Sequence, residues 1–296
     1  MFRDIENRYL GIKRTLRDVL DTWMTGTARE TNAQNWHFLC HVNGEDPTLY
    51  QVNAGKFIYD MSAQQLSDLL NIVQAILDDH LLEGGERDLW AFDYVTQEAQ
   101  RGTLEAFNNL SQQSDFYASQ TTLQQILSSP AYQNQIASAY LSTYSDWKLE
   151  SDRARGDIAN IIADAVARGV NPRETAQVIS KRLDVSISRA KNMAQTEQVG
   201  ALRQAQWNET DWAAERLGLN TGLLWISALK PTTRPWHASR HGKVYTTEEV
   251  RDFYAVNGNR YNCYCSQIPV LLNDDGSIFN EGLADKLKKE RNAWQT

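Results

Sequence analysis

Apolar positions recur every three or four residues along most of the first 216 residues, which is the period of amphipathic helices. This pattern predicts helices over residues 3–24, 62–83, 88–110, 123–149, 157–169 and 173–183, and one that starts at Ser186 or Ser188 and runs to about residue 216. The helix over 62–83 has the clearest start, because Ser62 and Gln65 have the spacing of a capping box. Gly84 suits a left-handed position after it.

Proline, glycine and polar stretches predict the breaks between these helices. Pro130 marks a first turn or a break within 123–149. Gly169 ends one helix, and Asn171 with Pro172 forms an N-cap and first turn for the next. The polar stretches 25–35 and 111–122 are predicted to be loops, and the apolar stretch 36–42 is predicted to be a short strand.

The hydrophobic pattern changes after Gly218. Residues 222–229 are apolar with a β-branched centre and predict a strand. A loop or short helix then leads to a second strand-like piece that ends at Tyr245. The turn sequence at 257–261 precedes a closing strand over 263–272. The chain is therefore predicted to be an α+β protein, with a mostly helical N-terminal part and a small C-terminal domain of helices and a short antiparallel sheet.

Composition narrows the class of protein. The 296 residues are 42% hydrophobic and 23% charged, which is ordinary for a globular chain. No apolar run approaches the roughly 20 residues that span a bilayer, and charges begin at residue 3, so we expect no membrane association. The net charge of −7 disfavours a protein built mainly to coat nucleic acid.

Two scarce residue types gather near the C-terminus. Two of the five histidines, His237 and His241, lie four apart, and two of the three cysteines, Cys263 and Cys265, lie two apart. These spacings put the imidazoles on one helix face and the sulfurs on one strand face, so the four side chains could form a tetrahedral structural zinc site. The alternative is that the histidines cap a turn while the cysteines pack inside the small sheet.

Other chemical candidates are weaker. His37, Cys40 and His41 are expected to pack in a buried segment, with the cysteine as a small hydrophobe. A nucleophilic cysteine paired with His237 or His241 is conceivable, but nothing separates it from a ligand. Glu197 lies on a helix face of small and apolar residues and should pair with Arg234 or Arg240, as a structural ion pair rather than as an acid or base.

Several motifs follow one another in a recognisable order. They are MAQTE at 193–197, LLWIS at 223–227, TRPWHASRHGKVY at 233–245 and NGNRYNCYCSQIP at 257–269, after a helix–glycine–helix unit at 157–183. In order and in gaps, residues 155–272 resemble the phage minor head proteins of the Mu F-like head morphogenesis group. Gln195 and Tyr264 stand at positions where that group commonly has arginine.

The resemblance implies a division of the chain and a structural role. Residues 1–150 would form a helical N-terminal domain with a portal-binding region, 151–272 the Mu F-like domain, and 273–296 a C-terminal amphipathic tail. The protein would be a virion component inside the head near the portal, present in the host cytoplasm during assembly. It would assist procapsid assembly and DNA packaging or ejection, and would not be an enzyme. Its expected partners are the portal protein, the major capsid or scaffolding protein and packaged DNA.

Two alternatives stay open. The first is a zinc-dependent nuclease built on His237, His241, Cys263 and Cys265. The second is an internal virion protein that binds DNA through its basic tail, whose affinity should fall steeply with salt if phosphate contacts drive it. The tail residues 280–294 carry Lys286, Lys288, Lys289 and Arg291 and predict one amphipathic helix.

Overall fold

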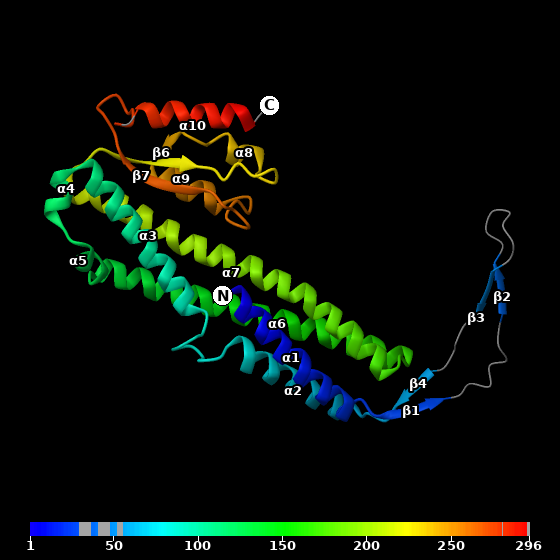
Figure 1. Cartoon of the computed structure of the whole chain (residues 1–296). Coiled ribbons are helices and arrows are strands. Elements are labelled where there is room, and N and C mark those ends of the chain that lie inside the picture. Colours follow the sequence, from blue (N-terminus) through cyan, green and yellow to red (C-terminus); the bar gives the residue numbers. More distant parts are fainter. Residues whose placement is uncertain (30–36, 41–47, 52–55, 280, 295–296) are drawn as a thin grey trace. The chain divides into compact units, whose positions relative to one another are not determined.

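A computed structural model describes residues 1–29, 37–40, 48–51, 56–279 and 281–294 of the chain (Figure 1). These residues form two compact units, each assembled from separate stretches of sequence. The N-terminal unit combines Arg3–Glu83 with Trp147–Arg189, and the C-terminal unit combines Met1–Phe2, Gly84–Asp146 and Ala190–Thr296. The units interleave along the chain, so they do not coincide with the sequence ranges 1–150 and 151–272.

Helices supply most of both units. The N-terminal unit contains α1 (Phe2–Trp23), β1 (Gly26–Arg29), β2 (His37–Cys40), β3 (Thr48–Gln51), β4 (Lys56–Tyr59), α2 (Ala63–Leu81), the second part of α6 (Pro130–Arg168) and the first part of α7 (Pro172–Leu217). The C-terminal unit contains α3 (Phe92–Gln113), α4 (Asp115–Gln120), α5 (Leu123–Leu127), the remaining parts of α6 and α7, β5 (Thr221–Ile226), α8 (Pro235–Ala238), β6 (Val244–Tyr245), α9 (Thr247–Ala255), β7 (Ser266–Leu271) and α10 (Glu281–Trp294).

Four helical segments pack together in the N-terminal unit. The buried face of α1 follows the predicted helical period and consists of Ile5, Tyr9, Ile12, Leu16 and Leu20. Polar contacts join the segments: Tyr9 Oη donates to Glu150 Oε1 of α6 at 3.3 Å. Arg189 of α7 donates through Nε to the buried Glu150 at 2.7 Å. That pair satisfies a carboxylate which would be costly to bury alone.

Two antiparallel strand pairs belong to the same unit. Strand β1 pairs with β4, and β2 pairs with β3. The predicted strand at 36–42 is confirmed at His37–Cys40, whereas the loop prediction for 25–35 is wrong at Gly26–Arg29, because pairing with a distant strand decides that segment. The side chains of His37 and Cys40, and all of His41, lie outside the described parts of the chain.

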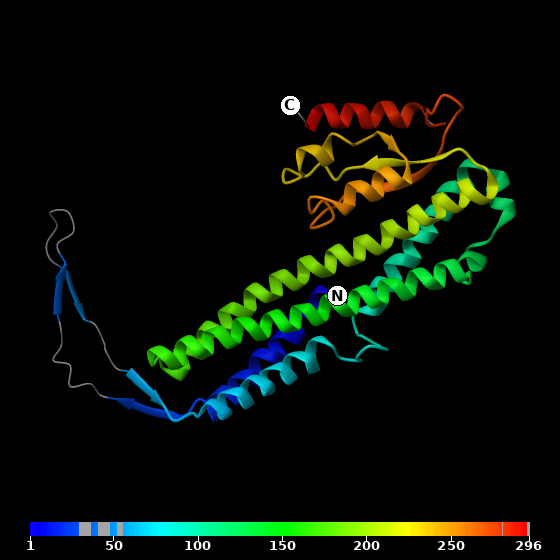
Figure 2. The same ribbon diagram turned by 180° about the vertical axis from the view of Figure 1, so that it is seen from behind.

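The sheet of the C-terminal unit has the order β6-β5-β7 and is antiparallel throughout. Successive residues of β5 face opposite sides, as a strand requires. Leu223 and Trp225 pack in one core with residues of α7 and α9, while Leu224 packs in another with Leu287 of α10. The sheet therefore lies between α10 on one face and α9 with α7 on the other, as Figures 1 and 2 show.

A close helix crossing supports that arrangement. Gly102 of α3 faces Leu202 of α7 so closely that an added Cβ would lie 2.2 Å from the Leu202 carbonyl oxygen. Only glycine fits there without moving a backbone. The crossing places the buried part of α7, which carries the site described below, against α3.

The predicted fold class is confirmed: the chain is mostly helical, with a small antiparallel sheet near the C-terminus. The local signals at helix ends are confirmed as well. Ser62 and Gln65 form the capping box of α2, Pro130 begins α6, and Gly169 has a left-handed φ of +69° before α7 begins at Pro172. The predicted C-terminal helix is found as α10.

Two predicted helix breaks are wrong. Helix α6 continues from 130 to 168, and α7 continues through Ser186 and Ser188. Neither serine caps a helix. The Ser188 hydroxyl instead donates back to the Asp184 carbonyl oxygen at 3.3 Å, and buried Ser186 accepts from Arg189. A serine hydroxyl can bond within the helix as well as at its start, so the residue type alone does not mark a break.

Two short helices escaped the sequence prediction. Residues 111–122, predicted to be a loop, contain the end of α3 and all of α4, whose N-cap Ser114 accepts from the Tyr117 backbone N–H. Helix α9 was not predicted, although Thr246 and Glu249 form a capping box that the sequence displays.

Candidate functional site

One histidine and two cysteines meet in the interior of the C-terminal unit. Cys263 Sγ lies 3.3 Å and Cys265 Sγ 3.7 Å from Nδ1 of His237. The three ligating atoms all lie within 4.8 Å of one another, and all three residues are buried. We call His237, Cys263 and Cys265 the thiol cluster.

Local structure explains how the two short sequences reach one point. His237 lies in α8, a single turn that begins at Pro235 after the extended N-cap residue Arg234. The cysteines directly precede β7 and alternate with an exposed residue: Cys263 and Cys265 are 6% and 3% exposed, while Tyr264 is 50% exposed. Both sulfurs therefore lie on one side of this segment, although the closing strand predicted over 263–272 forms only at Ser266–Leu271.

Arg203 of α7 holds the cysteine segment from the other side. It is 2% exposed. Its Nε donates to the Cys265 carbonyl oxygen at 2.9 Å, and its Nη2 donates to the carbonyl oxygens of Cys263 at 2.9 Å and Cys265 at 2.6 Å. A planar guanidinium fork matches two neighbouring acceptors of this kind. Arg203 thereby fixes the backbone from which both sulfurs project.

Arg234 determines which nitrogen of His237 carries the proton. Its Nη1 lies 3.1 Å from His237 Nε2, and arginine can only donate. Nε2 must then accept, so a neutral imidazole carries its proton on Nδ1, the nitrogen that faces Cys263. Arg234 also donates to the carbonyl oxygens of Asn259 and Tyr261, which ties α8 to the turn before the cysteines.

The surroundings of the cluster shift the pKa values of the two cysteines in opposite directions. The pKa of Cys263 lies well below its usual range, because Cys265 and His237 donate hydrogen bonds to its thiolate and the Arg203 charge is near. The pKa of Cys265 is raised, because its proton is held by that hydrogen bond to Cys263 and because the residue is buried. One thiolate and one thiol share the site, with the Ser227 hydroxyl 3.6 Å from Cys265 Sγ.

Aromatic rings enclose the cluster. Tyr254 of α9 lies between Trp225 and Trp207, with ring centroids at 5.4 and 5.7 Å and nearly parallel planes. Tyr254 Oη lies 3.5 Å from Cys263 Sγ, and the Arg203 guanidinium lies 4.5 Å from the tyrosine ring centroid. Burial raises the pKa of Tyr254 well above its usual value, so the phenol keeps its proton and can donate to the thiolate.

The fourth predicted ligand, His241, does not join the cluster. Its Nδ1 accepts from the Ser227 backbone N–H at 2.9 Å, and its Nε2 lies 3.1 Å from Glu290 Oε2 in α10. The spacing argument fails because α8 ends at Ala238, so His237 and His241 do not share a helix face. His241 instead connects the end of β5 to α10, which Arg291 reinforces by donating to the His241 carbonyl oxygen.

The predicted ion pair between Glu197 and Arg234 stays a prediction. Glu197 is half-buried on α7, and Arg234 contacts His237, Asn259 and Tyr261. Near Glu197 on α7, the two departures from the family pattern contact each other. The Tyr264 hydroxyl donates to Gln195 Oε1 at 2.9 Å.

The ligand spacing of the thiol cluster suits zinc, whereas the protonation of His237 does not. A tetrahedral zinc separates a nitrogen and a sulfur ligand by about 3.5 Å, given bonds of about 2.0 and 2.3 Å, which agrees with the two sulfur–nitrogen distances. Zinc also requires an imidazole nitrogen without a proton, whereas the Arg234 contact places the proton on Nδ1. Among the described residues, three side chains and not four supply ligand atoms. The structural zinc stays a prediction.

Sequence reasoning missed the residues that complete the site. Arg203 stands alone in the small and apolar run VGALRQAQW, where a buried guanidinium needs acceptors, and that was the available signal. Tyr254 and Ser227 carried no signal, because tyrosine and serine are common and their contacts are set only by the fold.

Cys263→Ser should destabilise the folded chain by about 2 kcal/mol, since the buried donors around the thiolate exchange a charged acceptor for a neutral hydroxyl. The effect should depend on pH. The thiolate has a lower pKa in the folded than in the unfolded chain, so its stabilisation is complete above the ordinary thiol pKa and is lost as the pH falls toward the folded value. Urea unfolding should therefore show a larger difference from the parent at pH 8 than at pH 5. Cys265→Ser is the matched control, because that thiol keeps its proton throughout this interval and its effect should be constant.

Arg234→Gln should increase the zinc that the protein retains. Without the guanidinium, His237 can carry its proton on Nε2 and leave Nδ1 free to ligate. Metal analysis after dialysis against a zinc buffer should give more zinc per chain for the variant than for the parent, and none for Cys263→Ser with Cys265→Ser. Equal zinc in the parent and the Arg234 variant would show that the arginine contact does not control the site.

The similarity to known proteins includes the segment that carries the thiol cluster. Residues 156–268 match the family model described as Phage Mu protein F like protein. That range contains Arg203, His237 and both cysteines of the cluster, and it agrees with the resemblance found over 155–272.

Minor head protein GP7 of Bacillus phage SPP1 is 27% identical over 149 residues, which cover 45% of this chain and 48% of the relative. The chain thus spans about half the length of this curated relative. No solved structure is significantly similar. Over residues 156–268 the chain is similar to the phage Mu F-like proteins, and the relative that it resembles is named a minor head protein.

Proposed function

We propose that this chain is a minor head protein of a tailed phage, bound to the portal inside the head, that assists procapsid assembly and DNA packaging or ejection. The observation that carries the proposal is the family match over 156–268, which includes the whole thiol cluster. The related protein of phage SPP1 is named a minor head protein. Portal protein is the first expected partner, with major capsid or scaffolding protein as the next.

A structural role of the thiol cluster supports this proposal over an enzymatic one. Cys263, Cys265 and His237 are each at least 94% buried, and aromatic rings enclose them. A nucleophile or a catalytic metal must be reached by its substrate, and these sulfur and nitrogen atoms instead contact one another and their neighbours. Contacts of the cluster hold α7, α8, α9 and the sheet together.

The proposed function also implies that the protein is located inside the phage head. Among the described residues, no helix combines the length and the apolar character that crossing a membrane requires. The protein would be made in the host cytoplasm and enter the head during assembly.

Deletion of the gene from its phage should leave heads that package or deliver DNA poorly, and complementation with the full chain should restore infectivity. In the wild-type phage, the chain should purify with portal oligomers and be present in few copies per head. Heads of normal composition and infectivity made without the chain would refute the proposal. Complementation with Cys263→Ser distinguishes a structural from an enzymatic role of the cluster. If the cluster only stabilises the fold, infectivity should fall in proportion to the loss of folding stability.

Contact with single-stranded DNA is a second candidate function, favoured by exposed aromatic residues of the C-terminal unit. Trp236, Tyr261 and Tyr264 are each about half exposed. Lys230 Nζ lies 3.4 Å from the centroid of the Tyr264 ring, and the Arg260 guanidinium lies 4.8 Å from that of Tyr261. Exposed rings beside cations form the usual platform for single-stranded nucleic acid.

Trp236→Ala and Tyr261→Ala should each weaken binding of a single-stranded oligonucleotide about tenfold, since base stacking is worth about 1–3 kcal/mol per base. Fluorescence anisotropy at several salt concentrations measures this, and the parent's affinity should fall steeply with salt. Phe116→Ala removes a similarly exposed ring elsewhere in the same unit and should leave affinity unchanged. A parent affinity that does not respond to salt would exclude binding driven by phosphate contacts.

A further inference from the structure

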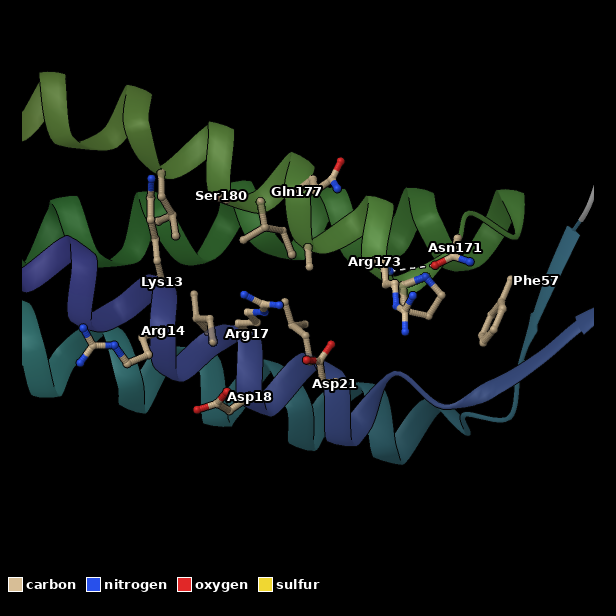
Figure 3. Close-up of a pocket in the computed structure, with 16 residues that line it drawn as sticks. Lys13, Arg14, Arg17, Asp18, Asp21, Phe57, Asn171, Arg173, Gln177 and Ser180 are labelled. Atoms are coloured by element: carbon tan, nitrogen blue, oxygen red, sulfur yellow. Dashed lines mark hydrogen bonds between the residues drawn. The ribbon is translucent and has the colours of Figure 1, made fainter. Parts of the chain in front are cut away.

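A long groove in the N-terminal unit takes no part in the site described above. It has a volume of about 1250 Å³ and lies between α1 and the first turns of α7, with Phe57 of β4 at one end (Figure 3). Its floor is apolar and is formed by Leu16, Leu20, Ala176, Ile179 and Leu183. The groove follows α1 from Lys13 to Asp21 and, on the other side, runs from Asn171 along α7 to Leu183.

Two arginines reach into the groove from opposite helices. Arg17 of α1 and Arg173 of α7 lie in the space between the helices in Figure 3. Both residues are exposed, and no acidic side chain of the described residues forms an ion pair with either guanidinium. Lys13, by contrast, is paired with Asp184 at 2.6 Å.

The charge of the groove is opposite to that of the chain. Arg14, Arg17 and Arg173 line it beside the paired Lys13, against two acidic residues, Asp18 and Asp21, while the whole chain has a net charge of −7. An apolar floor with unpaired arginines at its edges complements a helix that has an apolar face flanked by carboxylates. The same charge would disfavour a basic or a purely apolar occupant.

The dimensions suit a short helix. At 1.5 Å per residue, the α1 side of the groove extends about 12 Å and the α7 side about 18 Å, which corresponds to roughly two to three helical turns. A segment of that length can place apolar residues at i, i+3 and i+4 against the floor and acidic residues at both edges.

We propose that this groove docks an acidic amphipathic helix of the portal protein. The inference rests on the proposed function, which supplies the partner, and it adds the surface and the chemistry of the contact. The arginines give the contact its charge specificity, and the buried leucines beneath give it its apolar area.

The test measures binding of purified portal protein to the immobilised full chain. Arg17→Glu with Arg173→Glu should weaken binding at least tenfold, and affinity of the parent should fall with salt. Ala176→Trp, which fills the groove without a change of charge, should weaken binding to a similar extent. Arg3→Glu with Lys181→Glu is the matched control: it makes the same charge change on the same two helices outside the groove, and binding should change less than twofold.

The outcomes separate the inference from the function on which it rests. If the parent chain does not bind portal protein, portal association itself is refuted. If the parent binds and the groove variants bind equally well, the groove is not the docking surface, although portal association stands. Loss of self-association or of DNA binding in the groove variants, with portal binding intact, would assign the groove to a second copy or to nucleic acid and overturn the inference. Circular dichroism of each variant confirms that the helices are retained.

Discussion

The buried guanidinium of Arg203 is the interaction on which the C-terminal unit depends. It donates three hydrogen bonds to the carbonyl oxygens of Cys263 and Cys265, so the segment before β7 is held against α7 by main-chain acceptors. A charge buried to this extent is tolerated only when it is fully paired. Helix and segment therefore require each other: without the cysteine carbonyls the guanidinium would be unpaired, and without the guanidinium the sulfurs would not face His237.

The same cation also contributes to the chemistry of the cluster. The hydrogen bonds from Cys265 and His237 lower the pKa of Cys263, and the positive charge of Arg203 lowers it further. The proton on His237 faces that thiolate because Arg234 occupies the other ring nitrogen. Two arginines on different elements thus define one charge state for the site. This explains how a histidine and two cysteines can close a small domain by hydrogen bonds, and why a metal would have to displace part of that arrangement.

Sequence reasoning succeeded where the determinant was local. The apolar period located α1, α2 and α10, and the end signals at Pro130, Gly169 and Pro172 were found in the structure as predicted. It failed where a distant partner decides the outcome. Ser186 lies in an unbroken α7 because burial and Arg189 hold it there, and β1 forms because β4 pairs with it. His241 was grouped with His237 by spacing alone. The short helix α8 ends between the two histidines, and the Ser227 backbone N–H donates to Nδ1 of His241.

The two features of functional interest lie in different units, and this separation bears on their interpretation. The thiol cluster is internal to the C-terminal unit, where Arg203, His237 and both cysteines contact polar neighbours. The groove belongs to the N-terminal unit and presents Arg17 and Arg173 without ion-pair partners among the described residues. Satisfied buried charge stabilises a fold, whereas unsatisfied exposed charge beside apolar surface is available to a partner. The distribution of charge therefore favours a C-terminal unit that is stabilised from within and an N-terminal unit that offers a surface for contact with another molecule.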